Sequence, residues 1–213
     1  MITLNPHDHI LQQACPTVMV PRFEQMPVLD DNGHRFLVSE NGLWLEVKRP
    51  WLHLTWPLAE QAKVAMPYGK LLPSLSLAFT QLPGDLITRF INDARMTLPN
   101  EFAAWITWDD LTGEFRYHAL QSAIATAAYL RLKRPALAEN EHLVVDIHSH
   151  GHLPAFFSPT DDRDDAGEVK LSVVIGSLGA DQQPTSRLRL CANGLTLNAE
   201  TVKSMTGLRI GEC

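Results

Sequence analysis

The sequence has few cysteines, and they form no recognisable motif. Cys15, Cys191 and Cys213 are odd in number, widely spaced and without a C-x-x-C pair. Disulfide frameworks and cysteine-based zinc sites need closely patterned cysteines, so this distribution argues against both. We expect a protein of the reducing cytoplasm.

Long hydrophobic runs and basic clusters are also missing from the sequence. No apolar segment approaches the roughly 20 residues that a membrane-spanning helix needs. Residues 1–13, MITLNPHDHILQQ, lack the basic start and apolar core of a secretory signal. The net charge is −6, whereas a nucleic-acid-binding domain normally carries a clustered basic face. The sequence therefore predicts neither a membrane nor a nucleic-acid partner.

What is present is an ordinary globular composition. The 213 residues are 45% hydrophobic and 20% charged, which is enough for one large or two small domains. Residues 1–65 are rich in aromatics and β-formers, with a typical hairpin turn at Asn41-Gly42, and predict a small β-rich N-terminal domain. Residues 66–84 carry prolines and glycines around LPSLSLAFTQLPG, which predicts a surface linker.

Residues 85–213 alternate between helical and strand patterns. Apolar residues recur at helical spacing after Asp85, and Pro99 predicts the end of that helix. An alanine-rich stretch, residues 122–132, predicts a second helix. Strand patterns occur around the turn at 110–113, at 142–147, at 171–178 and around a hairpin at Asn193-Gly194. This alternation favours an α/β domain over residues 85–213.

The chemistry of the chain is concentrated in residues 146–165, DIHSHGHLPAFFSPTDDRDD. His148 and His150 are two apart at the end of a predicted strand, where residues i and i+2 point to the same face. Asp161 follows a proline-containing loop and supplies an oxygen ligand. Two histidines, one carboxylate and one water make the open tetrahedral site of catalytic zinc, which lowers the pKa of the water to ~7. A base must then take the proton, and Glu101 is the candidate.

Each of these residues also has a purely structural interpretation. Ser158-Pro159-Thr160-Asp161 has serine at the N-cap, proline at N1 and an acid at N3, which makes a good helix start. Both interpretations hold together if Asp161 reaches the metal from the first turn of a helix. Glu101 follows Pro-Asn, where a glutamate is usually a solvated turn residue. Glu114 and Glu141 are the other candidates for the base.

Two further histidine motifs are less informative. His152 extends the run to H-x-H-x-H and is a surface residue, a partner of a ligand or an alternative ligand. His7-Asp8-His9 has no Ser-x-x-Asp after it, and we interpret it as a loose terminus.

The pattern resembles the JAMM/MPN (JAB-type) family of zinc metallopeptidases. The family signature is H-x-H, seven residues, then S-x-x-D, with a glutamate well upstream. His148, His150, Ser158 and Asp161 fit that spacing, and Glu101 stands shortly after a predicted helix and a proline, as in the family. The similarity covers roughly residues 85–180. More narrowly, a tryptophan-rich β unit ahead of such a domain resembles the protein A family of the bacterial PRTRC cassette, which also encodes a ubiquitin-like protein.

The resemblance implies a fold and an activity. The fold is a mixed sheet flanked by helices, partly like that of cytidine deaminases. The activity is zinc-dependent hydrolysis of a peptide or isopeptide bond in a protein or peptide substrate, such as a ubiquitin-like tail. By analogy, His148, His150 and Asp161 hold one Zn²⁺ per chain, Glu101 activates the water and Ser158 stabilises the oxyanion.

The sequence departs from the family at one position. Members often carry glycine three residues after the glutamate, where this chain has Ala104, and Trp105 and Trp108 follow. The cleft wall is therefore expected to be bulkier, which leaves open a JAMM-like interaction module without catalysis. A third hypothesis, a zinc nucleobase deaminase, lacks its His-x-Glu and Pro-Cys-x-x-Cys elements here.

Overall fold

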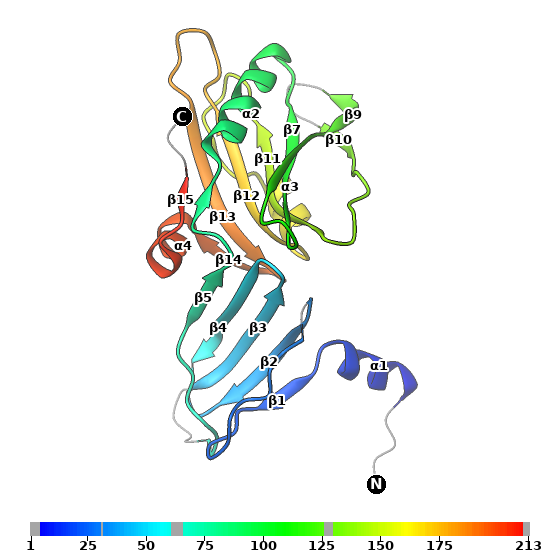
Figure 1. Cartoon of the computed structure of the whole chain (residues 1–213), viewed down its shortest axis with the longest axis vertical. Coiled ribbons are helices and arrows are strands. Elements are labelled where there is room, and N and C mark those ends of the chain that lie inside the picture. Colours follow the sequence, from blue (N-terminus) through cyan, green and yellow to red (C-terminus); the bar gives the residue numbers. More distant parts are fainter. Residues whose placement is uncertain (1–4, 31, 61–65, 126–129, 211–213) are drawn as a thin grey trace. The chain divides into compact units, whose positions relative to one another are not determined.

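The computed structural model describes residues 5–30, 32–60, 66–125 and 130–210, and the chain divides into two compact units (Figure 1). The first unit is Met1–Ala78 and the second is Phe79–Cys213. This boundary falls within residues 66–84, the segment expected to be a surface linker, which also contains strands β5 (Ser74–Leu77) and β6 (Gln81–Leu82). Leu75 of β5 is buried and pairs with Leu54 of β4, so β5 is the last strand of the first sheet.

The first unit is built on a five-stranded sheet in the order β1-β2-β3-β4-β5. β1 runs parallel to β2, and the other pairs are antiparallel. The β-rich N-terminal unit expected from the sequence is confirmed. Its remaining strands are β1 (Thr17–Met19), β2 (His34–Ser39), β3 (Gly42–Arg49) and β4 (Leu52–Glu60).

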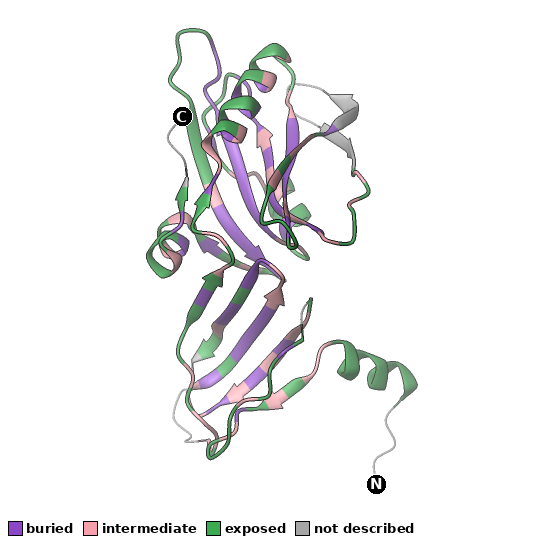
Figure 2. Ribbon diagram, viewed as in Figure 1, coloured by how far each residue is buried: buried purple, intermediate pink, exposed green. Residues whose placement is uncertain are grey.

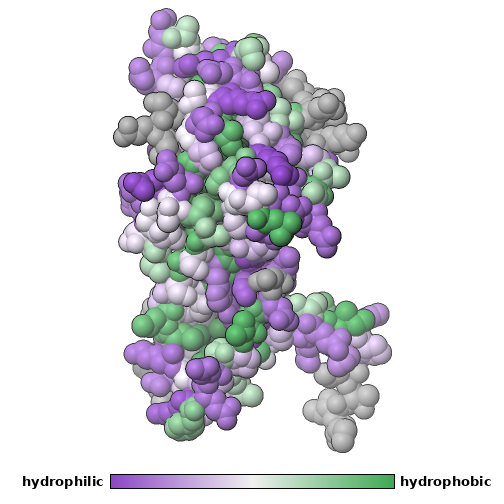
Figure 3. Space-filling model, viewed as in Figure 1, coloured by the Kyte–Doolittle hydropathy of each residue, from purple (hydrophilic) through white to green (hydrophobic). Residues whose placement is uncertain are grey.

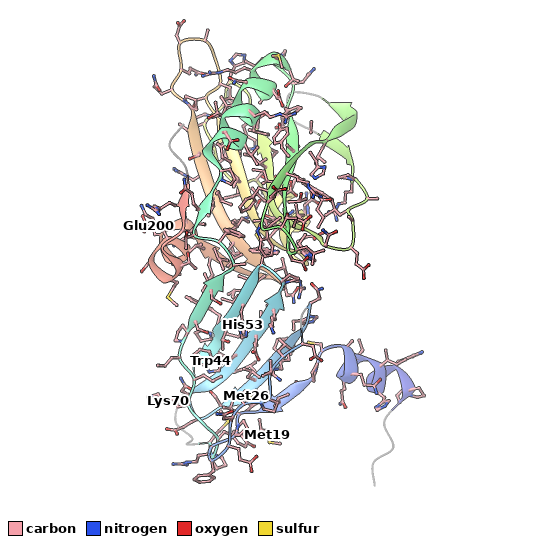
Figure 4. All side chains as sticks on the ribbon, in the orientation of Figure 1. Met19, Met26, Trp44, His53, Lys70 and Glu200 are labelled. Atoms are coloured by element: carbon pink, nitrogen blue, oxygen red, sulfur yellow. The ribbon has the colours of Figure 1, made fainter. Side chains whose placement is uncertain are left out.

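Trp44 of β3 belongs to a small hydrophobic cluster. It is 2% exposed and packs with Val20 and Leu37, and the partly buried Met26 lies against this cluster (Figure 4). The same sheet contains a buried ion pair between neighbouring strands. Arg35 Nε lies 2.6 Å from Glu46 Oε2, and the two residues are paired in the register of β2 and β3.

Helix α1 (Pro6–Ala14) precedes the sheet and has no buried residue. It contains the His7-Asp8-His9 motif, which was expected in a loose terminus. The side chain of Asn5 accepts a hydrogen bond from the amide of His7 and so caps the helix, which explains the difference. Ile10 and Leu11 are more than half exposed, and hydrophobic atoms are visible on the surface of α1 in Figure 3.

The second unit contains a six-stranded mixed sheet in the order β14-β13-β12-β11-β7-β8. The central pair, β11 and β12, is parallel, and the other pairs are antiparallel. This confirms the expected α/β class with a mixed sheet. The strands are β7 (Ala103–Asp109), β8 (Phe115–Ala119), β11 (Glu141–Ser149), β12 (Val169–Gly176), β13 (Thr185–Ala192) and β14 (Leu195–Asn198).

The two faces of this sheet differ in polarity. Facing residues in adjacent strands lie on the same side of a sheet, and the register places Ile147, Val173 and Ala104 together on an apolar face. Asp146, Ser172 and Arg189 fall on the opposite, polar face. The central strands are buried in Figure 2.

Three helices accompany the sheet. Helix α2 (Gly84–Met96) packs against β7, and α4 (Ala199–Thr206) packs against β13 and β14. The short helix α3 (Pro159–Asp165) contacts the polar face through ion pairs with Lys170 and Arg189. In the part of the chain that the structure describes, no helix has the length and apolar character to span a membrane.

Two local expectations have opposite outcomes. The helix predicted over 122–132 is wrong for the described residues of that range, since β9 (Gln121–Ala125) and β10 (Leu130–Lys133) form an antiparallel pair. Residues 126–129 lie outside the described residues. The helix propensity of alanine is a weak preference, and tertiary strand pairing overrides it. The hairpin at Asn193-Gly194 is confirmed, since both residues have the positive φ that a two-residue turn requires. Finally, β15 (Arg209–Ile210) pairs in parallel with β6.

Candidate metal centre

The end of β11 carries the first two candidate ligands. His148 lies on the polar face of the sheet, next to Ala103 of β7 in the register. His150 follows the strand, and its amide donates to the carbonyl of Ile175 at 2.9 Å, which ties this turn to β12. The Nε2 atoms of His148 and His150 lie 3.3 Å apart. The two imidazoles therefore converge through their Nε2 atoms, as the i, i+2 spacing predicted.

Helix α3 brings the third candidate ligand from its first turn. Ser158 is the N-cap and Pro159 the first helical residue, as predicted. The amide of Ser158 donates to Asp161 Oδ2 at 2.6 Å, and the amide of Asp161 donates to Ser158 Oγ at 3.3 Å. Asp161 Oδ1 lies 3.4 Å from His148 Nε2. The cap and the convergence on the histidines thus use different oxygens of one carboxylate.

Two of the three separations among these atoms match those in a tetrahedral zinc site. Two ligand atoms at about 2.0–2.1 Å from tetrahedral zinc lie roughly 3.3–3.4 Å apart. The observed separations are 3.3 Å between the two Nε2 atoms and 3.4 Å from His148 Nε2 to Asp161 Oδ1. One ligand atom from each of His148, His150 and Asp161 lies within 4.8 Å of the others. Two nitrogens and one carboxylate oxygen are also the donor set of an open zinc site.

The environment of His150 favours the form that binds metals. Burial lowers its pKa below the ordinary value, and the neighbouring His148 lowers it further. The charge of Asp161 and the backbone of Pro154 act in the opposite direction and raise the pKa. Nδ1 of His150 is buried and has no partner that meets the distance and angle limits of a hydrogen bond. A neutral imidazole is the form that ligates a metal.

Glu101 lies just before β7 and within electrostatic reach of the ligand group. Burial raises its pKa to about 7, and the charge of Asp161 contributes to the increase. Ser149, which stands between the two histidines in the sequence, fixes the position of the segment that carries Glu101. The Oγ of Ser149 accepts the amide of Phe102 at 2.9 Å, and its own amide donates to the carbonyl of Phe102 at 2.8 Å.

The loop between the histidines and α3 crosses the end of β12 at Gly176. A Cβ atom on Gly176 would overlap the carbonyl oxygen of Leu153 and the amide of Ala155, so only glycine permits this approach. The ring of Phe156 meets the ring of His150 edge-on, with centroids 4.4 Å apart. Leu153 and Phe156 are 56% and 47% exposed, which gives the loop an apolar surface beside the ligands.

The other sequence candidates lie outside the ligand group. His152 is exposed and is not part of the metal-ligating group found among the described residues. Glu114 is exposed in the turn between β7 and β8. Glu141 begins β11, at the end opposite His148, where its carboxylate contacts His118 at 2.6 Å and Thr107 at 2.5 Å. Neither fallback glutamate stands beside the histidines.

The departure at Ala104 falls on the face of the sheet away from His148. Ala104 pairs with Ile147 and is fully buried, whereas Ala103 pairs with His148. Trp105 is buried in a cluster with Ala103, and Trp108 is partly buried against Phe79, with ring centroids 6.3 Å apart.

Three polar residues near the ligands were not singled out in the sequence. They are Ser149, Lys170 and Arg189, and each is buried. A signal was available for Lys170, because a lysine beside the apolar run of β12 needs a charged partner if it is buried. The partners themselves lie too far away in the sequence to be read from it.

Comparisons with known proteins divide the chain as the structure does. Residues 83–191, just over half of the chain, match the family described as prokaryotic homologs of the JAB domain. Residues 5–78 match a domain of unknown function, DUF2016. The solution structure of protein DSY2949 from Desulfitobacterium hafniense is 16% identical, covers 62% of this chain and 93% of its own, and superposes with a TM-score of 0.41. Comparison with curated proteins found no match.

Proposed function

Since the chain belongs to the prokaryotic homologs of the JAB domain, we propose that it is a zinc-dependent peptidase or isopeptidase. Its substrate is a protein or peptide, and a ubiquitin-like tail is the class that we favour. The observation that carries this proposal is that one ligand atom from each of the three residues lies within 4.8 Å of the others. Two of the separations, 3.3 and 3.4 Å, have the edge length of a zinc tetrahedron.

The zinc ligands are His148, His150 and Asp161. When bound, zinc supplies Lewis acidity, which polarises a carbonyl group and makes water acidic enough to ionise near neutral pH. The protein contributes the orientation of the ligands. The capping box leaves Asp161 Oδ1 directed at the histidines, and the backbone bond to Ile175 holds His150.

Glu101 is the general base and acid. A carboxylate whose pKa stands near 7 can take a proton from water and return it to a leaving amine at neutral pH. Two observations support this role: Glu101 is partly buried, and it is close enough to Asp161 to feel its charge. The hydrogen bonds between Ser149 and Phe102 keep the glutamate segment against the end of β11.

Ser158 stabilises the oxyanion. Its Oγ already accepts the amide of Asp161, so the hydroxyl hydrogen remains available to donate. A donor aimed at the developing charge is the requirement for this role. The exposed side chains of Leu153 and Phe156 offer apolar contacts to a substrate chain beside the ligands.

The biological setting follows from the same resemblance. A ubiquitin-like partner, a cytoplasmic location and kinship with the PRTRC protein A family are parts of this proposal.

The test is metal content, measured by mass spectrometry on the purified full chain. About one zinc per wild-type chain, lost in the His148→Ala/His150→Ala double variant, would support the site. The same preparations are then assayed on ubiquitin-like proteins with C-terminal extensions. Absence of zinc in the wild type after reloading would reject the hydrolase. Zinc without cleavage, together with tight partner binding, would instead favour a silent interaction module.

A further inference from the structure

We propose that Lys170 and Arg189 are positioning residues for the metal centre: through Asp165 they hold helix α3, and with it Asp161, at ligand distance from the histidines. This inference rests on the proposed function, since it concerns the same metal site. It adds the contacts that set the distance between the two histidines at the end of β11 and Asp161 on α3.

Helix α3 has almost no apolar packing of its own. It contains seven residues, PTDDRDD, and its one buried residue is Asp165. A helix of this length is unstable in isolation and depends on tertiary contacts. Because its buried contact is a carboxylate, the position of Asp161 depends on the partners of Asp165.

Lys170 connects α3 to the strand that carries the histidines. Its Nζ lies 2.7 Å from Asp146 Oδ2 and 3.0 Å from Asp165 Oδ1, and its side chain is 4% exposed. Asp146 precedes His148 by two residues on β11 and lies on the same face of the sheet. One buried ammonium group therefore bridges the histidine strand and the aspartate helix.

Arg189 contacts the residues on both sides of the Ser158–Asp161 segment. Its guanidinium donates to Asp165 Oδ2 through Nε at 3.0 Å and Nη2 at 2.7 Å, and to Asp162 Oδ1 at 2.6 Å. It also stacks over the ring of Phe157, 3.9 Å from the centroid. Phe157 immediately precedes the Ser158–Asp161 segment and Asp162 immediately follows it. A planar guanidinium with several fixed donors can bind Asp162 and stack on Phe157 at the same time, whereas an ammonium group cannot.

Stability alone is a weak explanation for this chain of ion pairs. Replacing buried charges with apolar residues of similar volume is often neutral or stabilising. The ion pairs instead fix the position of α3 relative to the sheet. They lie on the polar face of the sheet, next to the ligands. The groups that face Asp165 are Lys170, Arg189, Ser172 and Cys191.

The decisive variant is Arg189→Lys. It keeps the positive charge and removes both the multiple hydrogen bonds of the guanidinium group and its stacking on Phe157. Its matched control is Arg35→Lys, another buried arginine with a short carboxylate contact, in the first unit (Arg35 to Glu46, 2.6 Å). Zinc affinity is measured by competition with a chromogenic chelator, and melting temperature on the zinc-free protein. We expect zinc to bind about 10- to 100-fold more weakly in Arg189→Lys, as for other residues that orient ligands, and with unchanged affinity in Arg35→Lys.

A milder variant guards against misfolding. Asp162→Asn alters an exposed residue, whose side chain is 60% exposed, and weakens one contact of Arg189. We expect a smaller loss of zinc affinity, of a few-fold, with little change in melting temperature. Unchanged zinc affinity in both Arg189→Lys and Asp162→Asn would overturn the inference.

A readout without metal separates this inference from the proposed function. Amide hydrogen exchange of residues 158–165 in the zinc-free protein should accelerate in Arg189→Lys and not in Arg35→Lys. If the wild type binds no zinc, the proposed hydrolase fails, while the exchange rates still decide whether Arg189 holds α3. If the wild type binds zinc and exchange in α3 does not change, the positioning role alone is rejected.

Discussion

Ser158 and Asp161 hold each other through two reciprocal hydrogen bonds, from the amide of Ser158 to Asp161 Oδ2 at 2.6 Å and from the amide of Asp161 to Ser158 Oγ at 3.3 Å. This capping box leaves Asp161 Oδ1 free of the cap and 3.4 Å from His148 Nε2. The structural and the functional interpretation of the motif are therefore compatible, and variants can separate them.

Asp161→Asn should strongly weaken metal binding while preserving the helix. The amide oxygen of asparagine can still accept the hydrogen bond from Ser158, so we expect a small change in melting temperature. The neutral side chain is a poor zinc ligand, and affinity should fall by more than about 100-fold, beyond the usual cost of losing a residue that only orients a ligand. Thermal unfolding and zinc titration calorimetry measure the two effects. Retained zinc affinity would exclude Asp161 as a ligand.

Ser158→Ala should lower catalysis more than stability. Loss of the N-cap side chain costs about 1 kcal/mol, whereas loss of an oxyanion donor typically lowers kcat by about 100- to 1,000-fold. Ser158→Thr keeps both the cap and the hydroxyl and serves as the control. Steady-state kinetics on an extended ubiquitin-like substrate distinguish the roles, and similar kcat values for the two variants would leave Ser158 only its capping role.

Glu101→Gln should change the pH dependence of stability in the zinc-free protein. The folded-state pKa of Glu101 is raised to about 7 from the ordinary 4.5, so the folded chain keeps a proton that the unfolded chain releases between these values. Stability of the wild type therefore falls as pH rises from about 4.5 to 7 relative to the glutamine variant. Urea unfolding with a chelator at pH 5 and pH 8 measures this. An equal difference between wild type and variant at both pH values would contradict the raised pKa.

Gly176→Ala should displace the loop that leads to α3. The added methyl group would overlap the backbone of Leu153 and Ala155, and overpacking of this kind costs about 1–3 kcal/mol. Because the loop connects both parts of the ligand group, zinc affinity should fall as well. Gly167→Ala is the matched control, since a methyl group there meets no atom within 4 Å. Equal zinc affinities of the two variants would show that the loop adapts without consequence.

Ser149→Ala should separate Glu101 from the ligands. It leaves the amide of Phe102 without its acceptor, at a cost of about 1–3 kcal/mol, and we expect kcat to fall while zinc still binds. Ser39→Ala is the control: Ser39 is equally buried and accepts the amide of Asn41 in the first unit. A loss of stability similar to that of the control, without a loss of kcat, would limit Ser149 to a structural role.

The local features of this site can be predicted from the sequence. The spacing of His148 and His150, the N-cap at Ser158 and the hairpin at Asn193-Gly194 all follow from rules that act within a few residues, and the structure has each of them. The same rules failed at residues 122–125 and 130–132, where alanine content predicted a helix and the structure has the paired strands β9 and β10.

Which distant residues support the ligands depends on how the strands are arranged in the folded chain. Ser149 contacts Phe102 across 47 positions, and Lys170 contacts Asp146 across 24. Both contacts depend on which strands are neighbours and in what register, and no local pattern encodes that choice. The cause is physical: capping and side-chain periodicity are properties of a short backbone segment, whereas a buried ion pair forms only after the sheet has brought its two charges together out of water.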